Sequence, residues 1–220
     1  MKMTKRTLAT VTIIPLMLLI VFLTYRHTHQ NKSPNIIWIS LDTQRAKSLD
    51  LYGYHLKTSP FLKRIGESSA VFEKTWAQSS VTNLSHFSML TGTYPQKHKI
   101  LSINPNLRLP KEIKVVSEFF KERNYNTLIA GSFKGNPYLN LEVGLGRGFD
   151  YSFSDDPIKY DFSMQKVLEK IKFFASSTKP FFVFLHGWMV HVPYLPEKEC
   201  MDPFSFKYKG KIVWTEEELK

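Results

Sequence analysis

The chain has 220 residues, of which 43% are hydrophobic and 14% aromatic, which is enough for one globular domain with a core. Its formal net charge of +11 fits an anionic membrane surface, an acidic substrate or nucleic acid, but also a lysine-rich solvated surface. Beyond the N-terminus the basic residues are scattered and no nucleic-acid-binding motif is recognisable, so we expect no nucleic-acid partner. A single cysteine excludes a disulfide framework within the chain.

The N-terminus has the pattern of a membrane anchor. Residues 1–7 are a basic lead, and residues 8–25 are uncharged and largely apolar, long enough to span a bilayer core. No small-residue cleavage site follows, so the sequence predicts an uncleaved transmembrane signal anchor rather than a removable signal peptide. The basic lead favours a cytoplasmic N-terminus. We therefore expect a single-pass cell-membrane protein, with a linker at 26–34 and the remainder outside the cytoplasm, periplasmic or extracellular.

The rest of the chain alternates strands and helices. The expected strands are apolar runs at 35–40, 125–131 and 181–185. One helix is expected to begin at Pro60, with Thr58 or Ser59 as its cap, and two more are expected at 109–124 and 161–177. Apolar strands joined by long crossovers predict an α/β fold, with a mainly parallel sheet covered by helices on both faces. The glycine-rich stretch 144–150 fits a plain turn better than a phosphate loop, because it does not directly follow a clear strand.

Polar residues stand where such a sheet places a site. Asp42 follows the first strand, and His186 and His191 follow the last one. Because ligands bind at the carboxyl ends of parallel strands, these side chains are candidates for a functional site. The stretch SSVTNLSHFSMLTGTYPQKH, residues 79–98, is either a polar loop leading into a helix or the source of a reactive hydroxyl.

Several motifs in order carry a resemblance to a known family. NIIWISLDTQR opens with a strand, Asp42 and Arg45; LYGY and TSP follow; LTGTYP with a later histidine ends the 79–98 stretch; GRGFDYSF and HVPY come further on. This combination resembles the N-terminal region of sulfatases, within the alkaline phosphatase superfamily. The resemblance covers roughly residues 34–220. Residues 35–220 are therefore expected to be the N-terminal part of a sulfatase-like catalytic domain.

The resemblance implies roles for individual residues. Thr82 stands at the nucleophile position, and Asp42 with Thr82 would hold a divalent metal ion, which is calcium, zinc, manganese or magnesium. Arg45 and His86 would stabilise charge on the ester oxygens, and His191 would hold or protonate the leaving group, whereas a role for His186 stays open. Each assignment has a structural alternative. Thr82 can cap a helix, Asp42 can cap a turn and pair with Arg45, and His191 can be a loop residue.

The sequence also departs from the family pattern. Classical sulfatases oxidise a cysteine or serine to an aldehyde, which the secondary alcohol of Thr82 cannot form. Leu84 and His86 replace the proline and arginine of the nucleophile motif. The chain contains no Asp-His or Asp-Asn pair of the kind that supplies further metal ligands in the family. We therefore expect an incomplete domain that is inactive by itself.

Three functions remain open from the sequence. The first is a membrane-anchored sulfatase-family hydrolase that acts on sulfate or phosphate esters with a divalent metal. The second is a phosphoethanolamine or phosphoglycerol transferase acting on an envelope lipid or glycan. The third is a truncated, non-catalytic remnant that binds a partner or an anionic glycan.

Overall fold

The computed structural model describes residues 33–191, apart from 103, 105, 132, 134–138, 155–163 and 189, together with Met17. The chain divides into two units, residues 1–34 and 35–220. The predicted basic lead, nearly all of the predicted anchor at 8–25 and most of the linker lie outside the described residues, as do residues 192–220. In the part of the chain that the structure describes, no helix is both long enough and apolar enough to cross a membrane.

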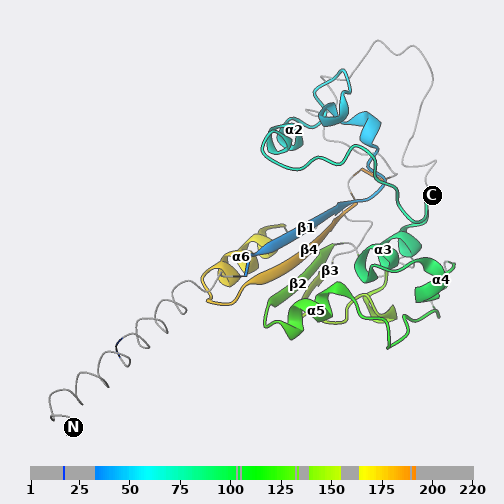
Figure 1. Cartoon of the computed structure of the whole chain (residues 1–220), viewed down its shortest axis with the longest axis vertical. Coiled ribbons are helices and arrows are strands. Elements are labelled where there is room, and N and C mark those ends of the chain that lie inside the picture. The colour runs from blue at the N-terminus through cyan, green and yellow to red at the C-terminus, as the bar shows by residue number, and fades with distance from the viewer. Residues whose placement is uncertain are drawn as a thin grey trace, which may run out of the picture. The chain divides into compact units, whose positions relative to one another are not determined.

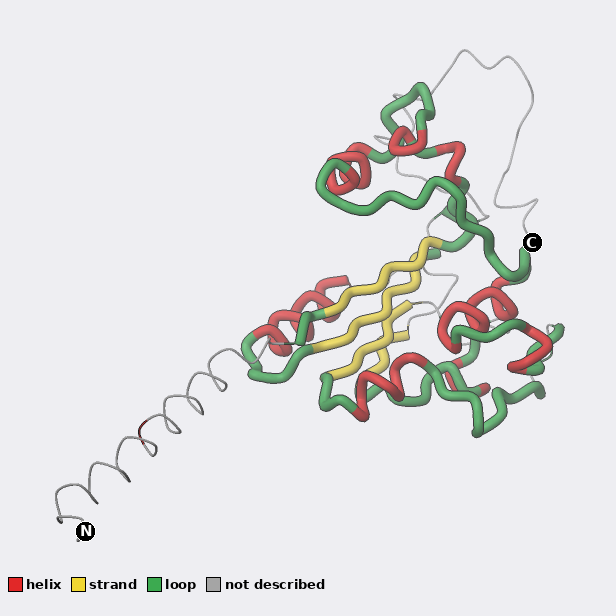
Figure 2. The backbone as a smooth tube through the Cα atoms, in the orientation of Figure 1, coloured by secondary structure: helices red, strands yellow, loops and turns green. Residues whose placement is uncertain are grey.

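A four-stranded parallel sheet forms the centre of the second unit (Figures 1 and 2). Its strands are β1 (Ile36–Leu41), β2 (Asn126–Gly131), β3 (Tyr151–Ser154) and β4 (Phe181–Gly187). Their order is β1-β4-β2-β3, and every neighbouring pair is parallel. The predicted parallel α/β fold is confirmed.

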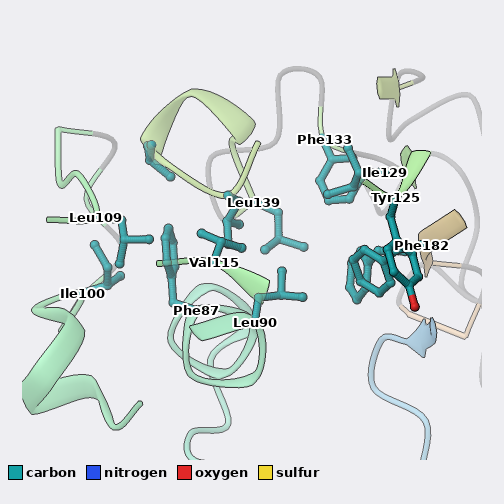
Figure 3. Packing of buried hydrophobic residues seen from close by; sticks show 13 residues of the cluster. Phe87, Leu90, Ile100, Leu109, Val115, Tyr125, Ile129, Phe133, Leu139 and Phe182 are labelled. Atoms are coloured by element: carbon teal, nitrogen blue, oxygen red, sulfur yellow. The ribbon is translucent and has the colours of Figure 1, made fainter. Parts of the chain in front are cut away.

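Helices cover both faces of this sheet. Residues of α6 (Met164–Ala175) pack on one face, where Val167 and Phe174 join Leu128 and Val183 in one cluster. The other face carries α3 (Thr82–Thr91) and α5 (Val116–Glu122), and its larger cluster includes Phe87, Ile129 and Phe182 (Figure 3). Alternate residues of one strand point to opposite faces, which is why Leu128 and Ile129 belong to different clusters.

The connections differ from the sequence expectation in three places. The helix predicted over 109–124 begins only at Val116, because Leu109 is held by the carbonyl of Val143 and the Glu118 side chain accepts the Val115 N–H at 2.8 Å. β3 was not predicted. Pro60 does open a helix, α2 (Pro60–Gly66), but the hydroxyl of the N-cap residue Ser59 donates to Asp50 instead of capping the helix. The remaining short elements are 3-10 helices at Ala46–Ser48, Asp50–Tyr52 and Leu141–Val143, and α4 (Pro95–His98).

The glycine-rich segment is a turn, as predicted. Residues 144–148 form successive turns, and the Arg147 guanidinium bonds the carbonyls of Pro110 and Ile113 and lies 3.5 Å from Glu118. Gly148 has a φ of +78°, and a Cβ there would lie 2.4 Å from the Glu118 nitrogen. The segment therefore packs against the start of α5, which only glycine permits at this position.

Candidate active site

Asp42 and Thr82 meet at the carboxyl end of β1. Asp42 is 8% exposed, and its N–H donates to the carbonyl of Gly187 at the end of β4, at 2.9 Å. Thr82 is the first residue of α3, and its hydroxyl donates to Oδ2 of Asp42 at 3.4 Å. The N-cap position belongs to Val81 and has no side-chain cap. The Thr82 side chain therefore faces the carboxylate and is not a helix cap.

His86 lies one helical turn after Thr82 and is buried. Its Nδ1 is 2.8 Å from the carbonyl of Thr82, and a carbonyl only accepts, so Nδ1 carries the hydrogen. Its Nε2 is 3.1 Å from Ser40 Oγ and 3.2 Å from His186 Nδ1. Burial lowers the pKa of His86 below its ordinary value, which leaves Nε2 as an acceptor. His86 therefore contacts the backbone of Thr82 rather than its hydroxyl.

His186 is the residue of β4 that reaches the site. It is 4% exposed, and its Nε2 is a buried nitrogen without a hydrogen-bond partner among the described residues, 3.7 Å from Asp42 Oδ2. Burial, together with the positions of His86 and His191, lowers the pKa of His186 to about 3, so the ring is neutral at pH 7. His186 lies within β4, whereas the predicted strand ends one residue before it.

His191 and Thr82 line one cavity. Its volume is about 280 Å³, and Ser80, Val81 and Trp188 complete the lining. The His191 ring stacks on Trp188, with ring centroids 3.8 Å apart. The hydroxyl of Thr43, the residue after Asp42, donates to the Val190 carbonyl at 2.8 Å. This hydrogen bond connects the loop after β1 to the loop after β4. Thr43 has a φ of +55°, an uncommon conformation for a β-branched residue and one typical of functional sites.

Arg45 does not join this group. It is exposed, and its guanidinium forms no ion pair with Asp42, so the local pairing considered from the sequence is absent. The residues that the structure does bring together are Asp42, Thr82, His86, His186 and His191. Ser40, Thr43 and Trp188 were missed, because their only signal in the sequence is their position beside the strand ends.

The donors at this edge of the sheet suit a divalent cation. Among the described residues, no group of three or more histidine, cysteine, aspartate or glutamate side chains could hold a metal ion. The set present is one carboxylate, one hydroxyl and the unpartnered nitrogen of His186. Nε2 of His186 and Oδ2 of Asp42 are 3.7 Å apart, and a cation between them could bind both atoms. These residues therefore fit part of a metal site.

Comparison with known proteins shows the family. The model of the Sulfatase family matches residues 34–211, so the chain belongs to the sulfatase family. It is 28% identical over 135 residues to an N-acetylgalactosamine-6-O-sulfatase of Bacteroides thetaiotaomicron, which covers 56% of this chain and 26% of that protein. It is 32% identical over 98 residues to the iduronate 2-sulfatase of Mus musculus, covering 44% of this chain and 18% of the relative.

Solved structures share the fold. The structure of Ps i-CgsB in complex with k-i-k-neocarrahexaose superposes with a TM-score of 0.62 at 21% identity, over 81% of this chain and 49% of that one. The zinc complex of the C-terminal periplasmic domain of EcEptC from Escherichia coli superposes with a TM-score of 0.58 at 17% identity, over 86% of this chain and 53% of that one. The chain thus spans about a quarter or less of the curated relatives it matches.

Proposed function

We propose that this chain carries one wall of the catalytic centre of a membrane-anchored, extracytoplasmic sulfatase-family hydrolase that cleaves sulfate or phosphate esters. The single observation that carries the proposal is the contact of the Thr82 hydroxyl with the buried carboxylate of Asp42 beside a cavity. The family match supports the class of reaction. Sulfated glycan substrates are a reasonable class, because matched relatives are named for sulfated sugars.

Thr82 is the nucleophile in this proposal. A neutral hydroxyl is a weak nucleophile and needs a base or a metal ion beside it. Asp42 accepts the hydrogen bond of the Thr82 hydroxyl, so the proton has a direct path away from the attacking oxygen. Thr82 is also the first residue of α3, where the positive end of the helix favours a developing oxyanion.

The reaction is a displacement in two steps. In the first, the Thr82 oxygen bonds to the phosphorus or sulfur, the ester bond to the alcohol breaks, and the alcohol leaves with a proton. His191 lines the same cavity and supplies that proton. In the second step, water attacks the phosphorus or sulfur of the threonine ester and gives a proton to His191, the bond to the Thr82 oxygen breaks, and that oxygen takes back the proton held by Asp42, which releases phosphate or sulfate and restores the hydroxyl.

Asp42 and Thr82 would hold a divalent cation, which lowers the pKa of the hydroxyl and offsets negative charge on the ester oxygens when bound. His86 acts as a positioning residue here, because its Nδ1 holds the carbonyl of Thr82 and its Nε2 faces Ser40 and His186. Arg45 remains a candidate for stabilising the ester oxygens, and its exposure leaves its side chain free to approach a substrate from solvent.

The test measures product release from an aryl phosphate and an aryl sulfate by the full-length protein with zinc, manganese, magnesium or calcium. Thr82→Ala is expected to lose several orders of magnitude in turnover, as expected for a missing nucleophile. Thr91→Ala is the matched control, because Thr91 is the last residue of the same helix and, within the described part of the chain, its hydroxyl bonds Phe87 and Thr93 and no residue of the site. Undiminished turnover by Thr82→Ala contradicts the proposal.

A phosphoethanolamine or phosphoglycerol transferase is the second candidate. The observation that favours it is the threonine itself, since a secondary alcohol cannot enter the aldehyde route of classical sulfatases. In that case an envelope lipid or glycan hydroxyl replaces water in the second step. Turnover that requires an added acceptor identifies the transferase, and turnover in water alone identifies the hydrolase. A full-length protein that binds an anionic glycan but releases no product from any ester is instead a binding remnant.

A further inference from the structure

We propose that Nε2 of His186 is a nitrogen ligand of the divalent cation that Asp42 and Thr82 hold, and that His86 fixes the tautomer which makes it one. The inference rests on the proposed function, because it concerns the same cation. It adds a ligand from β4, which lies between β1 and β2, to the two donors Asp42, directly after β1, and Thr82, at the start of α3. It also narrows the class of cation.

The carbonyl of Thr82 is one end of a chain of hydrogen bonds that reaches His186. That carbonyl only accepts, so His86 Nδ1 donates to it, and the neutral His86 ring then has a lone pair on Nε2. His186 Nδ1 lies 3.2 Å from that Nε2. The contact is a hydrogen bond only when His186 carries its hydrogen on Nδ1. Ser40 Oγ lies 3.1 Å from the same nitrogen and is a second donor to its lone pair, but a hydroxyl can rotate its hydrogen away whereas the His186 ring cannot turn a lone pair away from His86.

The opposite tautomer of His186 is disfavoured on both sides of the ring. With its hydrogen on Nε2, the ring would turn a lone pair on Nδ1 toward the lone pair of His86 Nε2. The gain would be a hydrogen bond to Asp42, but Nε2 and Oδ2 are 3.7 Å apart, longer than a hydrogen bond. A neutral His186 with a bare Nε2 is therefore the consistent state.

That bare nitrogen then faces the Asp42 carboxylate without a partner among the described residues. A buried acceptor left unsatisfied beside negative charge is unfavourable, and a cation between the two groups satisfies both. Two donors bound to one zinc ion, each about 2.1 Å from it, lie no more than about 4.2 Å apart. The 3.7 Å from Asp42 to His186 and the 3.4 Å from Asp42 to Thr82 both fall within that limit.

The His86 ring and the two neighbouring strands fix the orientation of the His186 ring, as is usual for a metal-binding histidine. Metal-binding imidazoles almost always donate their other ring N–H to a fixed partner, and His86 Nε2 is such a partner. His186 sits between strands β1 and β2, in register with Ser40 and Gly131. An imidazole donor suits zinc, whereas calcium and magnesium prefer oxygen donors. The structure therefore favours a zinc-type cation over calcium at this site.

The first experiment titrates zinc and calcium into the full chain and its variants by calorimetry. His186→Ala is expected to weaken zinc affinity by more than about 100-fold, above the 10- to 100-fold that outer partners of a metal typically cost. His86→Phe, which removes the partner but no ligand, is expected to fall within that 10- to 100-fold range. His55→Ala, at an exposed site, is the control and should bind zinc as the wild type does.

The second measurement needs no variant and covers the case in which His186→Ala fails to fold. Nitrogen NMR of the full chain labelled on its 7 histidines reports which ring nitrogen carries hydrogen. The expected result is an Nδ1–H tautomer for His186 and a shift of its Nε2 resonance when zinc is added. A protonated Nε2 that zinc does not move overturns the inference.

The two proposals fail in different ways. If Asp42→Asn weakens zinc binding while His186 Nε2 stays unmoved, the metal site stands and His186 is only a buried neighbour. If His186 binds zinc but Thr82→Ala keeps full ester turnover, the ligand assignment stands and the nucleophile assignment is wrong.

Discussion

His86 and His186 are 100 positions apart in the chain, yet His86 Nε2 and His186 Nδ1 are 3.2 Å apart and the two ring planes cross at 86°. This contact links the helix that presents Thr82 to the strand that faces Asp42. Through it, the backbone of the proposed nucleophile and the proposed nitrogen ligand belong to one buried polar chain. Such networks are stabilising only when every member is satisfied, and Nε2 of His186 has no hydrogen-bond partner among the described residues, which is the basis for the proposed cation.

Gly131 is predicted to control the position of His186. A Cβ at Gly131 would lie 2.7 Å from the His186 carbonyl oxygen and 2.9 Å from its Cβ, and φ there is +155°. Gly131→Ala is therefore expected to lower the free energy of unfolding by more than about 1 kcal/mol. It should also weaken zinc affinity although it removes no donor. Gly53→Ala is the matched control, because φ is +89° there but nothing lies within 4 Å. Equal losses of zinc affinity in both variants would count against this role.

Phe182 is predicted to be a main contributor to stability. It is fully buried in β4 and stacks with Phe120 at 4.4 Å and Phe149 at 5.9 Å between ring centroids. Phe182→Ala is expected to cost about 3–5 kcal/mol in chemical denaturation, because it leaves a cavity under α5. Phe173→Ala, at a side chain 61% exposed on α6, is expected to change stability by about 0.5 kcal/mol or less. A similar loss in both variants contradicts the packing described.

His98 is predicted to make the fold sensitive to acid. It is fully buried, its Nδ1 accepts the Ile100 N–H at 3.1 Å, and burial holds its pKa below the ordinary 6.5. As the pH falls through about 6.5, His98 of the unfolded chain takes up a proton but His98 of the folded chain does not, so the free energy of unfolding falls with the pH. Between about pH 7 and about pH 5, the midpoint temperature should drop less steeply in His98→Gln than in the wild type. His55→Gln should keep the wild-type slope, and an unchanged slope in His98→Gln refutes the prediction.

Much of the fold could be predicted because its strands are distinctive. The runs that became β1, β2 and β4 are apolar along their length, which is the pattern of buried parallel strands. β3 was missed because YSFS has four residues, two of them serines, and none of its side chains is fully buried. The start of α5 differs from the prediction because Ile113 shares a helical spacing with Val116 and Phe120, but the carbonyls of Pro110 and Ile113 bind Arg147 from a distant turn.

The site could be predicted only in part. Asp42 and Thr82 were found because they belong to motifs, and the structure brings them together. The role proposed for His186 could not be predicted, because it depends on hydrogen bonds between residues 100 positions apart and on the tautomer that these bonds favour. Residue types and their spacing in the sequence do not show which distant residues hydrogen-bond or which tautomer a histidine adopts.

The membrane orientation is a prediction about residues outside the described part. We propose that residues 8–25 anchor the chain and that the sulfatase-family domain lies outside the cytoplasm, because the basic lead stays inside. A reporter fused after Lys220 is expected to be active only if it is of the type that requires export. Activity of a cytoplasm-only reporter at the same position rules this orientation out. Replacing Lys2, Lys5 and Arg6 with neutral residues should weaken the preference.

The central claim is that the Thr82 oxygen forms a covalent bond to the phosphorus or sulfur of its substrate. The most direct measurement is peptide mass spectrometry of the full-length protein after rapid acid quenching during turnover of a phosphate or sulfate ester with zinc. The expected result is a phosphoryl or sulfuryl group on Thr82 in the wild type and on no residue of Thr82→Ala. Turnover in the wild type with an unmodified Thr82, or a modified residue elsewhere in the quenched enzyme, contradicts the claim.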